Sequence, residues 1–316
     1  MKHSILFVLA SMIVSTSLGL AQQAEPATKP PKETEPAIIV ESYPDLASGG
    51  LSYAALAELP EGTVLRSDSL EITQMKLDAE ISKVPANIRD QLKKNSFFLL
   101  EQMATQELLV AEAKTELTKA KEDPSGKNSR QILSEYLQGL TDKVKVTEAE
   151  TVAFYEENKA MFGGASLEQI KPQIEQYLLQ QKKQEAVNQH ILTLGKRTKI
   201  EVAAAWVEKQ AVLAKDNPVD KARNSGKPSL VDFGAAGCRP CDMMTPILKT
   251  LSTKYQGKLN VEFVHVQQEQ ILAARYGVQS IPVQVFFDDK GKEVFRHTGF
   301  FPQLEIEKKL AEMGVK

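Results

Sequence analysis

Residues 230–241, LVDFGAAGCRPC, carry the most informative pattern in the carboxy-terminal part of the chain. The first four of these residues are an apolar run of the kind that forms a buried strand. Cys238 and Cys241 stand where a helix is expected to begin, continuing to about residue 255. Because a helical turn separates them, the two sulfurs come within bonding distance. The stretch therefore predicts a strand, a turn and a helix, with two neighbouring thiols at the turn.

The position of the thiols predicts their chemistry. Unpaired backbone N–H groups and the helix dipole stabilise an anion at a helix start, which lowers the pKa of the first thiol. We therefore expect Cys238 to be the nucleophile and Cys241, one turn deeper, to resolve the mixed disulfide. Arg239 and Pro240 lie between them and are expected to tune the thiolate, Arg239 through its positive charge.

No other redox group is expected. The chain has two cysteines in all, so no disulfide framework holds the fold together. The sequence contains no nicotinamide, flavin or metal motif. We therefore expect the Cys238–Cys241 pair itself to be the redox group, with no cofactor and no metal.

The sequence after the cysteines alternates between strands and helices. Strands are expected at 261–266, 283–287 and 293–297, with a hairpin turn at 288–291, and helices at 269–276 and 303–313. This order predicts an α/β fold whose sheet is covered by helices on both faces.

Residues 203–316 resemble the thioredoxin family at several separated positions. The resemblance implies that Asp232 is the buried carboxylate that assists proton transfer for the second cysteine. It implies that Pro246 bends the active-site helix, and that Ile281-Pro282 is the cis-proline loop that offers its backbone to an extended substrate. The family fold is a central mixed sheet flanked by helices, and the implied activity is thiol–disulfide exchange.

Four positions depart from the family pattern. Gly237 stands where the family has tryptophan before the first cysteine, and Gly234 replaces a second aromatic residue. Phe263 replaces a lysine that often neighbours the buried acid, and Val283 follows the proline where many reductants carry threonine. These differences leave the sulfurs more accessible and the direction of electron flow open.

Other interpretations of these residues remain. The cysteines could form half of a zinc site, but there is no second pair, and His265 and His297 lie at no metal-ligand spacing. They could instead form a structural disulfide. A hydrogen bond that satisfies the Asp232 carboxyl explains its burial as well as proton transfer does.

Residues 63–202 are predicted to be mainly helical. A strand–turn–strand signal at 64–72 leads to a helix cap at Thr73, and helices are expected at about 96–117 and 129–140. Two capping boxes, Thr147 with Glu150 and Ser166 with Gln169, open helices that continue to about 158 and 194. A short strand at 198–202 closes this part.

The helical part is similar to the amino-terminal module of SurA-type periplasmic chaperones and parvulin-type foldases. The similarity lies in the strand–turn–strand and in residues 101–109 and 146–158. In that family a prolyl isomerase domain follows, but here Phe162-Gly163-Gly164 leads directly into the next helix. The resemblance implies a helical cradle for unfolded chains without isomerase activity. The alternative is an α-helical packing domain with no chemistry of its own.

The first residues indicate export. Residues 1–21 combine a basic start, an apolar run and a small-residue cleavage site, as in a secretory signal peptide. An uncleaved membrane anchor is the alternative, although serines interrupt the run. Residues 22–62 are rich in proline and are expected to be an extended linker with no packed core. The mature protein would then work outside the cytoplasm, where thiols tend to be oxidised.

Composition sets the remaining limits. The 316 residues allow two domains, and 39 basic against 41 acidic side chains argue against a nucleic-acid partner. We expect an exported thiol–disulfide oxidoreductase, a reductase or isomerase, that holds unfolded or misoxidised proteins on its helical part. The family resemblance suggests a membrane thiol-electron carrier of the DsbD class as partner. The alternatives are a non-redox chaperone or assembly factor, and a dedicated reductant for one client, such as a cytochrome maturation apparatus.

Overall fold

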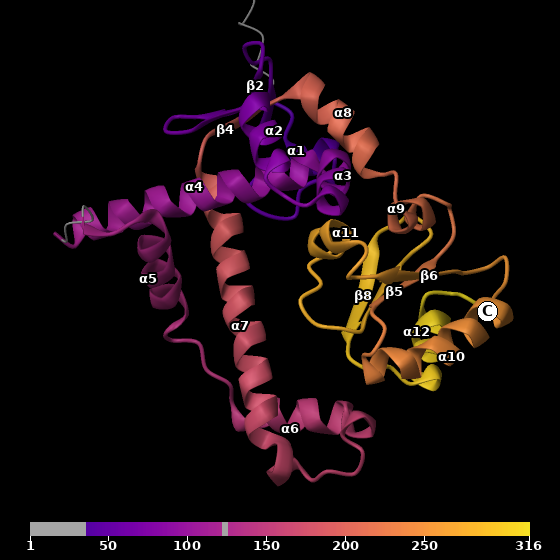
Figure 1. Ribbon diagram of the computed structural model, residues 1–316. Helices are drawn as coiled ribbons and strands as arrows, with labels where there is room; N and C mark the ends of the chain where they lie inside the picture. Colours follow the sequence, from indigo (N-terminus) through magenta and orange to yellow (C-terminus); the bar gives the residue numbers. More distant parts are fainter. Residues whose placement is uncertain (1–35, 122–125) are drawn as a thin grey trace, which may run out of the picture. The chain divides into compact units, whose positions relative to one another are not determined.

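The computed structural model describes residues 36–121 and 126–316 (Figure 1). In these ranges the chain forms two four-stranded sheets, the first with strand order β1-β4-β2-β3 and the second with order β6-β5-β7-β8. Within the same ranges no helix has the length and the apolar character needed to cross a bilayer. The signal peptide predicted at residues 1–21 lies outside the described residues.

The first sheet joins segments that are far apart in the sequence. Its strands are β1 (Ala55–Ala57), β2 (Thr63–Ser67), β3 (Glu71–Thr73) and β4 (Ile200–Ala203). β4 runs parallel to β1 and antiparallel to β2, which in turn pairs with β3. The chain therefore leaves the sheet after β3, forms a helical excursion, and returns to the middle of the same sheet.

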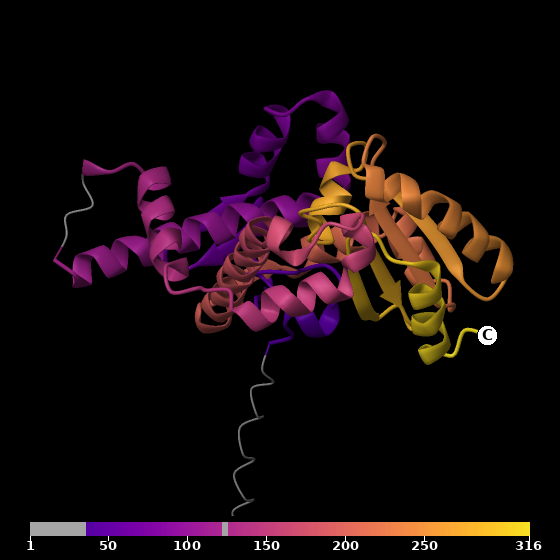
Figure 2. The same cartoon turned by 90° about the horizontal axis from the view of Figure 1, so that it is seen from below.

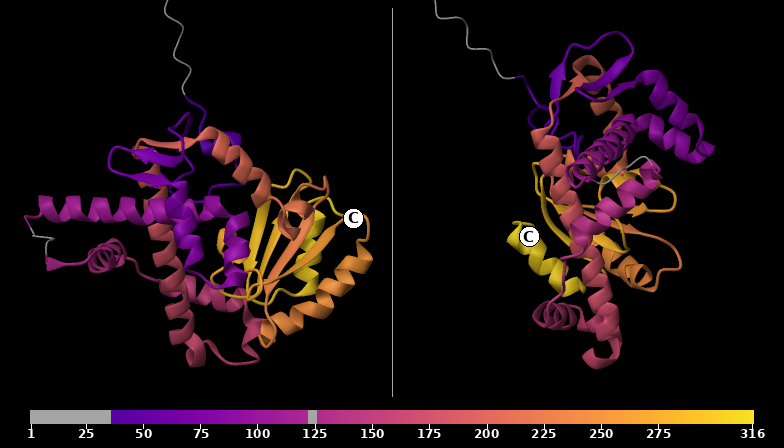
Figure 3. Two further views of the ribbon diagram at one scale, coloured as in Figure 1. Left: turned by 45° about the horizontal axis from the view of Figure 1, so that its top comes forward. Right: turned by 90° about the vertical axis from the view of Figure 1, so that its left-hand side faces the viewer.

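The helices of this part are α2 (Gln74–Ser82), α3 (Ala86–Lys94), α4 (Ser96–Lys119), α5 (Ser129–Thr141), α6 (Glu148–Glu157), the 3-10 turn η2 (Lys159–Phe162), α7 (Leu167–Arg197) and α8 (Ala204–Ala214). Both predicted capping boxes are present, and Thr73 caps α2 as expected. The sequence pattern does not indicate α3, because Leu92 is its only buried residue and no apolar stripe forms. Figures 2 and 3 show the two long helices α4 and α7 crossing one another.

The linker prediction is wrong for residues 36–62. This segment contains α1 (Ile39–Ser42) and β1, and the side chains of Ile39, Leu51 and Ala54 are fully buried in the core of the first sheet. Prolines suppress regular structure here, but apolar side chains scattered between them supply enough surface to bury.

Two contacts fix this segment to the helices. The carboxylate of Glu101, which is 2% exposed, accepts hydrogen bonds from the backbone N–H groups of Ser48, Gly49 and Leu51 at 2.9 to 3.3 Å. Near the end of α7, a Cβ on Gly195 would overlap the backbone carbonyl of residue 50. The segment therefore crosses α7 at a point where only glycine fits.

The second sheet has the mixed arrangement that the sequence predicts. Its strands are β5 (Ser229–Gly234), β6 (Asn260–His265), β7 (Val283–Phe287) and β8 (Glu293–Thr298). β5 is parallel to β6 and antiparallel to β7, and β8 is antiparallel to β7. The helices are α9 (Pro218–Arg223), α10 (Arg239–Lys254), α11 (Gln270–Arg275) and α12 (Gln303–Glu312).

Alternate residues of the central strands face two different helical layers. Leu230 and Phe286 pack with α10 and α12, which lie beside one another in Figure 1. Val231, Phe233 and Val285 pack with α9 and α11. Because side chains alternate along a strand, Asp232 lies on the α10 side of the sheet.

Helix α9 begins directly after Asn217. The Asn217 side chain accepts the backbone N–H of Asp220 and Pro218 occupies the first helical position. Proline is well suited to that position, because its N–H would have no helical partner there.

The two parts of the described chain are in contact. The side chain of Gln91 in α3 donates to the carbonyl of Gln268 at 2.6 Å and accepts the backbone N–H of Ile271 at 3.0 Å. Arg275 of α11 donates to the side chain of Asn95 at 2.9 Å. These bonds join the start of the helical part to α11.

Candidate functional site

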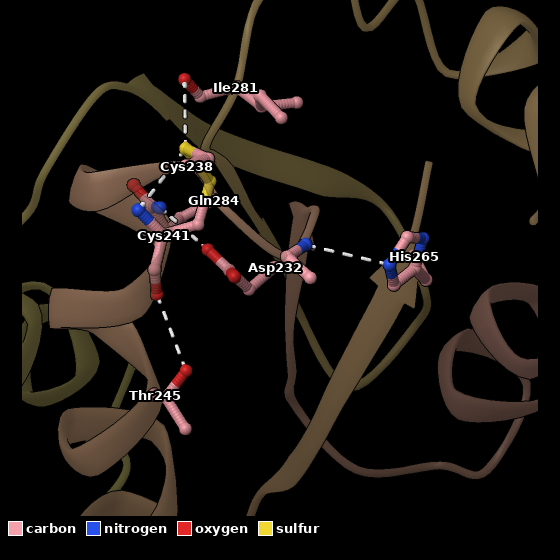
Figure 4. The surroundings of a disulfide bond; sticks show 8 residues. Asp232, Cys238, Cys241, Thr245, His265, Ile281 and Gln284 are labelled. Atoms are coloured by element: carbon pink, nitrogen blue, oxygen red, sulfur yellow. Dashed lines mark hydrogen bonds between the residues drawn. A yellow bond between two sulfur atoms is a disulfide. The ribbon is translucent and has the colours of Figure 1, made fainter. Parts of the chain in front are cut away.

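The two cysteines lie where β5 gives way to α10. Cys238 is the residue that caps α10, and its sulfur accepts the backbone N–H of Cys241 at 3.3 Å. The two are joined by a disulfide with a Cα–Cα distance of 5.2 Å (Figure 4). Cys238 is half-buried, whereas Cys241 is only 3% exposed. The sequence therefore brings both sulfurs together and leaves the first one accessible.

The start of α10 places a backbone donor at the first sulfur. The N–H of Cys241, in the first turn of the helix, points toward the Cys238 sulfur, and a donor at a helix start favours an anion. Arg239 is exposed beside it and Pro240 occupies the second helical position. Pro246 lies inside the same helix.

The second predicted element of the site is the loop before β7. The Ile281–Pro282 peptide bond is cis, and the carbonyl oxygen of Ile281 lies 4.0 Å from the Cys238 sulfur (Figure 4). Ser280 is exposed and Ile281 is half-buried, while Pro282 is buried. The backbone before the proline thus runs past the accessible sulfur.

Asp232 lies behind the disulfide and is fully buried in β5. One carboxylate oxygen accepts a hydrogen bond of 2.6 Å from the side-chain amide of Gln284. The other oxygen has no hydrogen-bond partner among the residues that the structure describes. Burial raises the pKa of Asp232 from its ordinary value of 3.8 to about 6, and the hydrogen bond from Gln284 opposes that rise.

Gln284 is a component of the site that sequence reasoning missed. It is fully buried in β7, directly opposite Asp232 in the strand register. An amide in the middle of an apolar run, VQVFF, is the signal that could have drawn attention to it. A buried polar side chain needs a partner, and Asp232 is that partner.

Two of the departures from the family pattern explain one another. The ring of Phe263 lies against Gly234, where an added Cβ would meet it at 2.9 Å and would meet the Cβ of Cys241 at 3.4 Å. Phe263 is 47% exposed on β6. The ring of Phe263, on the edge strand, therefore occupies the space beside Gly234 and leaves no room for a side chain at position 234.

The histidines have different surroundings. His265 ends β6 close to the cysteine loop, and its ring nitrogen lies 3.5 Å from the backbone N–H of Ala236. His297 stacks on Phe301 at a centroid distance of 4.2 Å, and burial lowers its pKa. His190 lies 3.0 Å from the Glu112 carboxylate, far along the sequence from the cysteines. Of the three, His265 alone contacts the cysteine loop.

Comparison with known proteins identifies relatives of the second sheet and its helices. The family model described as a thioredoxin-like domain matches residues 216–314. Thioredoxin 2 of Chlorobaculum tepidum is 39% identical over 89 residues, which are 28% of this chain and 81% of that protein. A thioredoxin of Alicyclobacillus acidocaldarius is 33% identical over 98 residues, 31% of this chain and 92% of the relative. A Staphylococcus aureus thioredoxin is 40% identical over 74 residues, covering 23% and 70%.

The family match begins after the helical part. Residues 63–202 lie outside the matched range. The similarity of that part to SurA-type chaperones therefore stays a prediction, whereas the α/β part has relatives over most of their length.

Proposed function

The chain belongs to the thioredoxin family through its carboxy-terminal part, and we therefore propose that it is a thiol–disulfide oxidoreductase acting on cysteines of unfolded or misoxidised proteins. The observation that carries the proposal is the half-buried Cys238 sulfur at the start of α10, next to the Ile281 carbonyl. In this arrangement one sulfur can be reached by a substrate while its partner stays covered.

The proposed exchange begins with the reduced dithiol. The Cys238 thiolate attacks one sulfur of a substrate disulfide, forms a mixed disulfide and releases the other substrate sulfur as a thiolate. Cys241 then loses its proton and attacks Cys238, which releases the second substrate thiol and leaves the Cys238–Cys241 disulfide. Two electrons pass to the substrate. A thiol donor, proposed to be a membrane carrier of the DsbD class, then supplies two electrons that reduce the Cys238–Cys241 disulfide again.

Asp232 is proposed to accept the proton of Cys241. With a pKa of about 6 the carboxyl is largely ionised at neutral pH but remains a better base than an ordinary aspartate. The oxygen without a hydrogen-bond partner among the described residues is free to take that proton. The amide of Gln284 holds the other oxygen in place.

Substitution of each cysteine tests this assignment. Cys241→Ser should accumulate the mixed disulfide with a substrate peptide, because the resolving thiol is missing, whereas Cys238→Ser should form none. Insulin reduction and mass spectrometry measure both. Alkylation of the reduced protein across a pH series should show that the Cys238 thiol ionises, and begins to react, at a lower pH than the thiol of free cysteine does. A Cys238 that titrates like free cysteine would contradict the redox function.

The helical part is proposed to hold the unfolded substrate. Supporting this, α4 and α5 enclose an open apolar cleft of about 490 Å³ that includes Leu117 and Leu140, both half-buried. A client held there would present its cysteines at a raised local concentration. The signal-peptide pattern of residues 1–21 supports action outside the cytoplasm.

Suppression of client aggregation tests the holding role. Leu117→Asp and Leu140→Asp should weaken the suppression, whereas the matched change Val152→Asp, at an exposed position of α6, should not. If Cys238→Ser suppresses aggregation as well as the original protein does, holding and exchange are separate activities. If no variant affects aggregation, the helical part does not hold clients.

A further inference from the structure

A second apolar cleft lies next to the disulfide, and both parts of the described chain contribute to it. It encloses about 280 Å³. Phe154 of α6, with Ile170 and Tyr177 of α7, forms one wall, and Ile281 and Thr298 form the other. The helical part therefore reaches the loop that precedes β7.

The helical wall is aromatic and only partly covered. The ring of Phe154 lies 5.2 Å from the ring of Tyr177 and 6.4 Å from that of Phe162, measured between centroids. All three residues are half-buried, as is Ile170. Tyr177 lines the cleft together with Ser280 and Thr298, which lie on the opposite side.

Ile281 connects this cleft to the sulfurs. The residue lines the cleft, while its backbone carbonyl lies 4.0 Å from the Cys238 sulfur. An extended peptide advances about 3.3 Å per residue. A substrate whose cysteine reaches Cys238 therefore places the side chains one or two residues away at the mouth of the cleft.

The size and polarity of the cleft define its ligand. A cavity of about 150 Å³ with apolar walls already accommodates a benzene ring, so the larger volume here has room for an aromatic side chain. A charged side chain would lose its hydration without gaining a partner of opposite charge from the wall residues. Phe154 and Tyr177 can instead contact another ring edge to face.

We propose that this cleft binds a large apolar side chain, aromatic by preference, one or two residues from the reactive cysteine of the substrate. The inference rests on the thiol exchange proposed above and adds a selection rule to it. By binding the neighbouring side chain, the helical part would determine which substrate cysteine reacts with Cys238, in addition to holding the client.

Peptide disulfides provide the test. Each short peptide carries one cysteine joined to a fluorescent thiol, with phenylalanine placed in turn one or two residues before or after the cysteine and glycine elsewhere. The all-glycine peptide is the reference. For the full chain we expect kcat/KM to exceed the reference by about tenfold at one or two of these positions, the low end for burying a large apolar side chain.

Two variants remove the wall and one serves as a control. Phe154→Ala and Ile170→Asp should reduce the ratio of phenylalanine to glycine rates to near one. Val152→Asp adds the same charge as Ile170→Asp on the exposed side of α6 and should keep the full ratio. Phe154→Ala is the milder change, so the ratio of phenylalanine to glycine rates is measured with this variant if Ile170→Asp fails to fold.

The outcomes separate this inference from the function on which it rests. If the full chain reduces all peptides at equal rates, the cleft does not select the side chain, although thiol exchange is still supported. The same conclusion follows if the ratio of phenylalanine to glycine rates falls as much in Val152→Asp as in Ile170→Asp. If no peptide is reduced, thiol exchange fails. Binding to the cleft is then measured by fluorescence anisotropy, with labelled peptides that carry serine in place of cysteine. Tighter binding of the phenylalanine peptide than of the glycine peptide supports the proposed binding of an aromatic side chain, and equal binding overturns it. If the original protein forms a dimer and Ile170→Asp does not, the cleft binds a second copy of the chain, and the proposal is overturned.

Discussion

Replacing Asp232 by asparagine should stabilise the oxidised protein at neutral pH. The carboxyl is fully buried and its pKa is raised from 3.8 to about 6. The folded state therefore binds a proton between these two pH values that the unfolded state does not. The stability that this proton provides is complete below pH 3.8 and is lost as the pH rises through about 6.

The rise of the pKa sets the magnitude. Each pH unit corresponds to about 1.4 kcal/mol, so ionising Asp232 reduces the free energy of unfolding by about 3 kcal/mol at pH 7. The asparagine side chain of the variant does not ionise, and its carbonyl oxygen can still accept the hydrogen bond from Gln284. We therefore expect the Asp232→Asn variant to gain about 3 kcal/mol on the original protein between pH 4 and pH 7.

Urea unfolding of both oxidised proteins at half-unit steps of pH measures this difference. Working with the disulfide intact removes the cysteine titrations, and carboxyls present in both proteins cancel in the difference. Asp289→Asn, an exposed position in the turn between β7 and β8, removes the same charge and should show no such trend. If the difference in unfolding free energy between Asp232→Asn and the original protein stays constant from pH 4 to 7, the pKa of Asp232 is not raised by burial.

The other predictions concern contacts that the sequence did not reveal. Gln284→Leu removes the amide that opposes the rise of the Asp232 pKa, so the pH profile of insulin reduction should move to higher pH; an unchanged profile would mean that the amide does not act on the carboxyl. Glu101→Ala leaves three backbone N–H groups without their acceptor and should lower the free energy of unfolding by about 3 kcal/mol in urea. The exposed change Gln106→Ala on the same helix should cost little, and equal losses would contradict the role of Glu101. Gly195→Ala should cost about 2 kcal/mol or more, because the new methyl group meets the backbone that crosses α7, and a melting temperature equal to that of the original would show that this backbone can move away.

Local patterns were sufficient for most of the second sheet. The apolar runs of β5 and β7 and the turn before β8 lie within one or two residues of their predicted positions, because each is written in adjacent residues. The capping boxes of α6 and α7 were equally readable. The disulfide pairing and the position of Cys238 at the helix start also follow from four consecutive residues.

Contacts between distant residues were not readable. Nothing near Glu101 in the sequence indicates that its carboxylate caps a loop some fifty residues earlier, so the prolines around that loop favour a linker instead. The pairing of Asp232 with Gln284 depends on strand register, which one sequence does not fix. The cleft beside Ile281 depends on where α6 and α7 end in space.

The length of α7 determines which surface meets the disulfide. Its 31 residues extend about 45 Å from the first sheet to the aromatic wall. Inserting one residue in its middle would shift the far end by about 1.5 Å and turn it by about 100°. Phe154 and Tyr177 would then face away from Ile281, with every residue of both sheets unchanged. The length of this one helix would thus set the substrate selectivity that we propose, independently of the chemistry of the thiols.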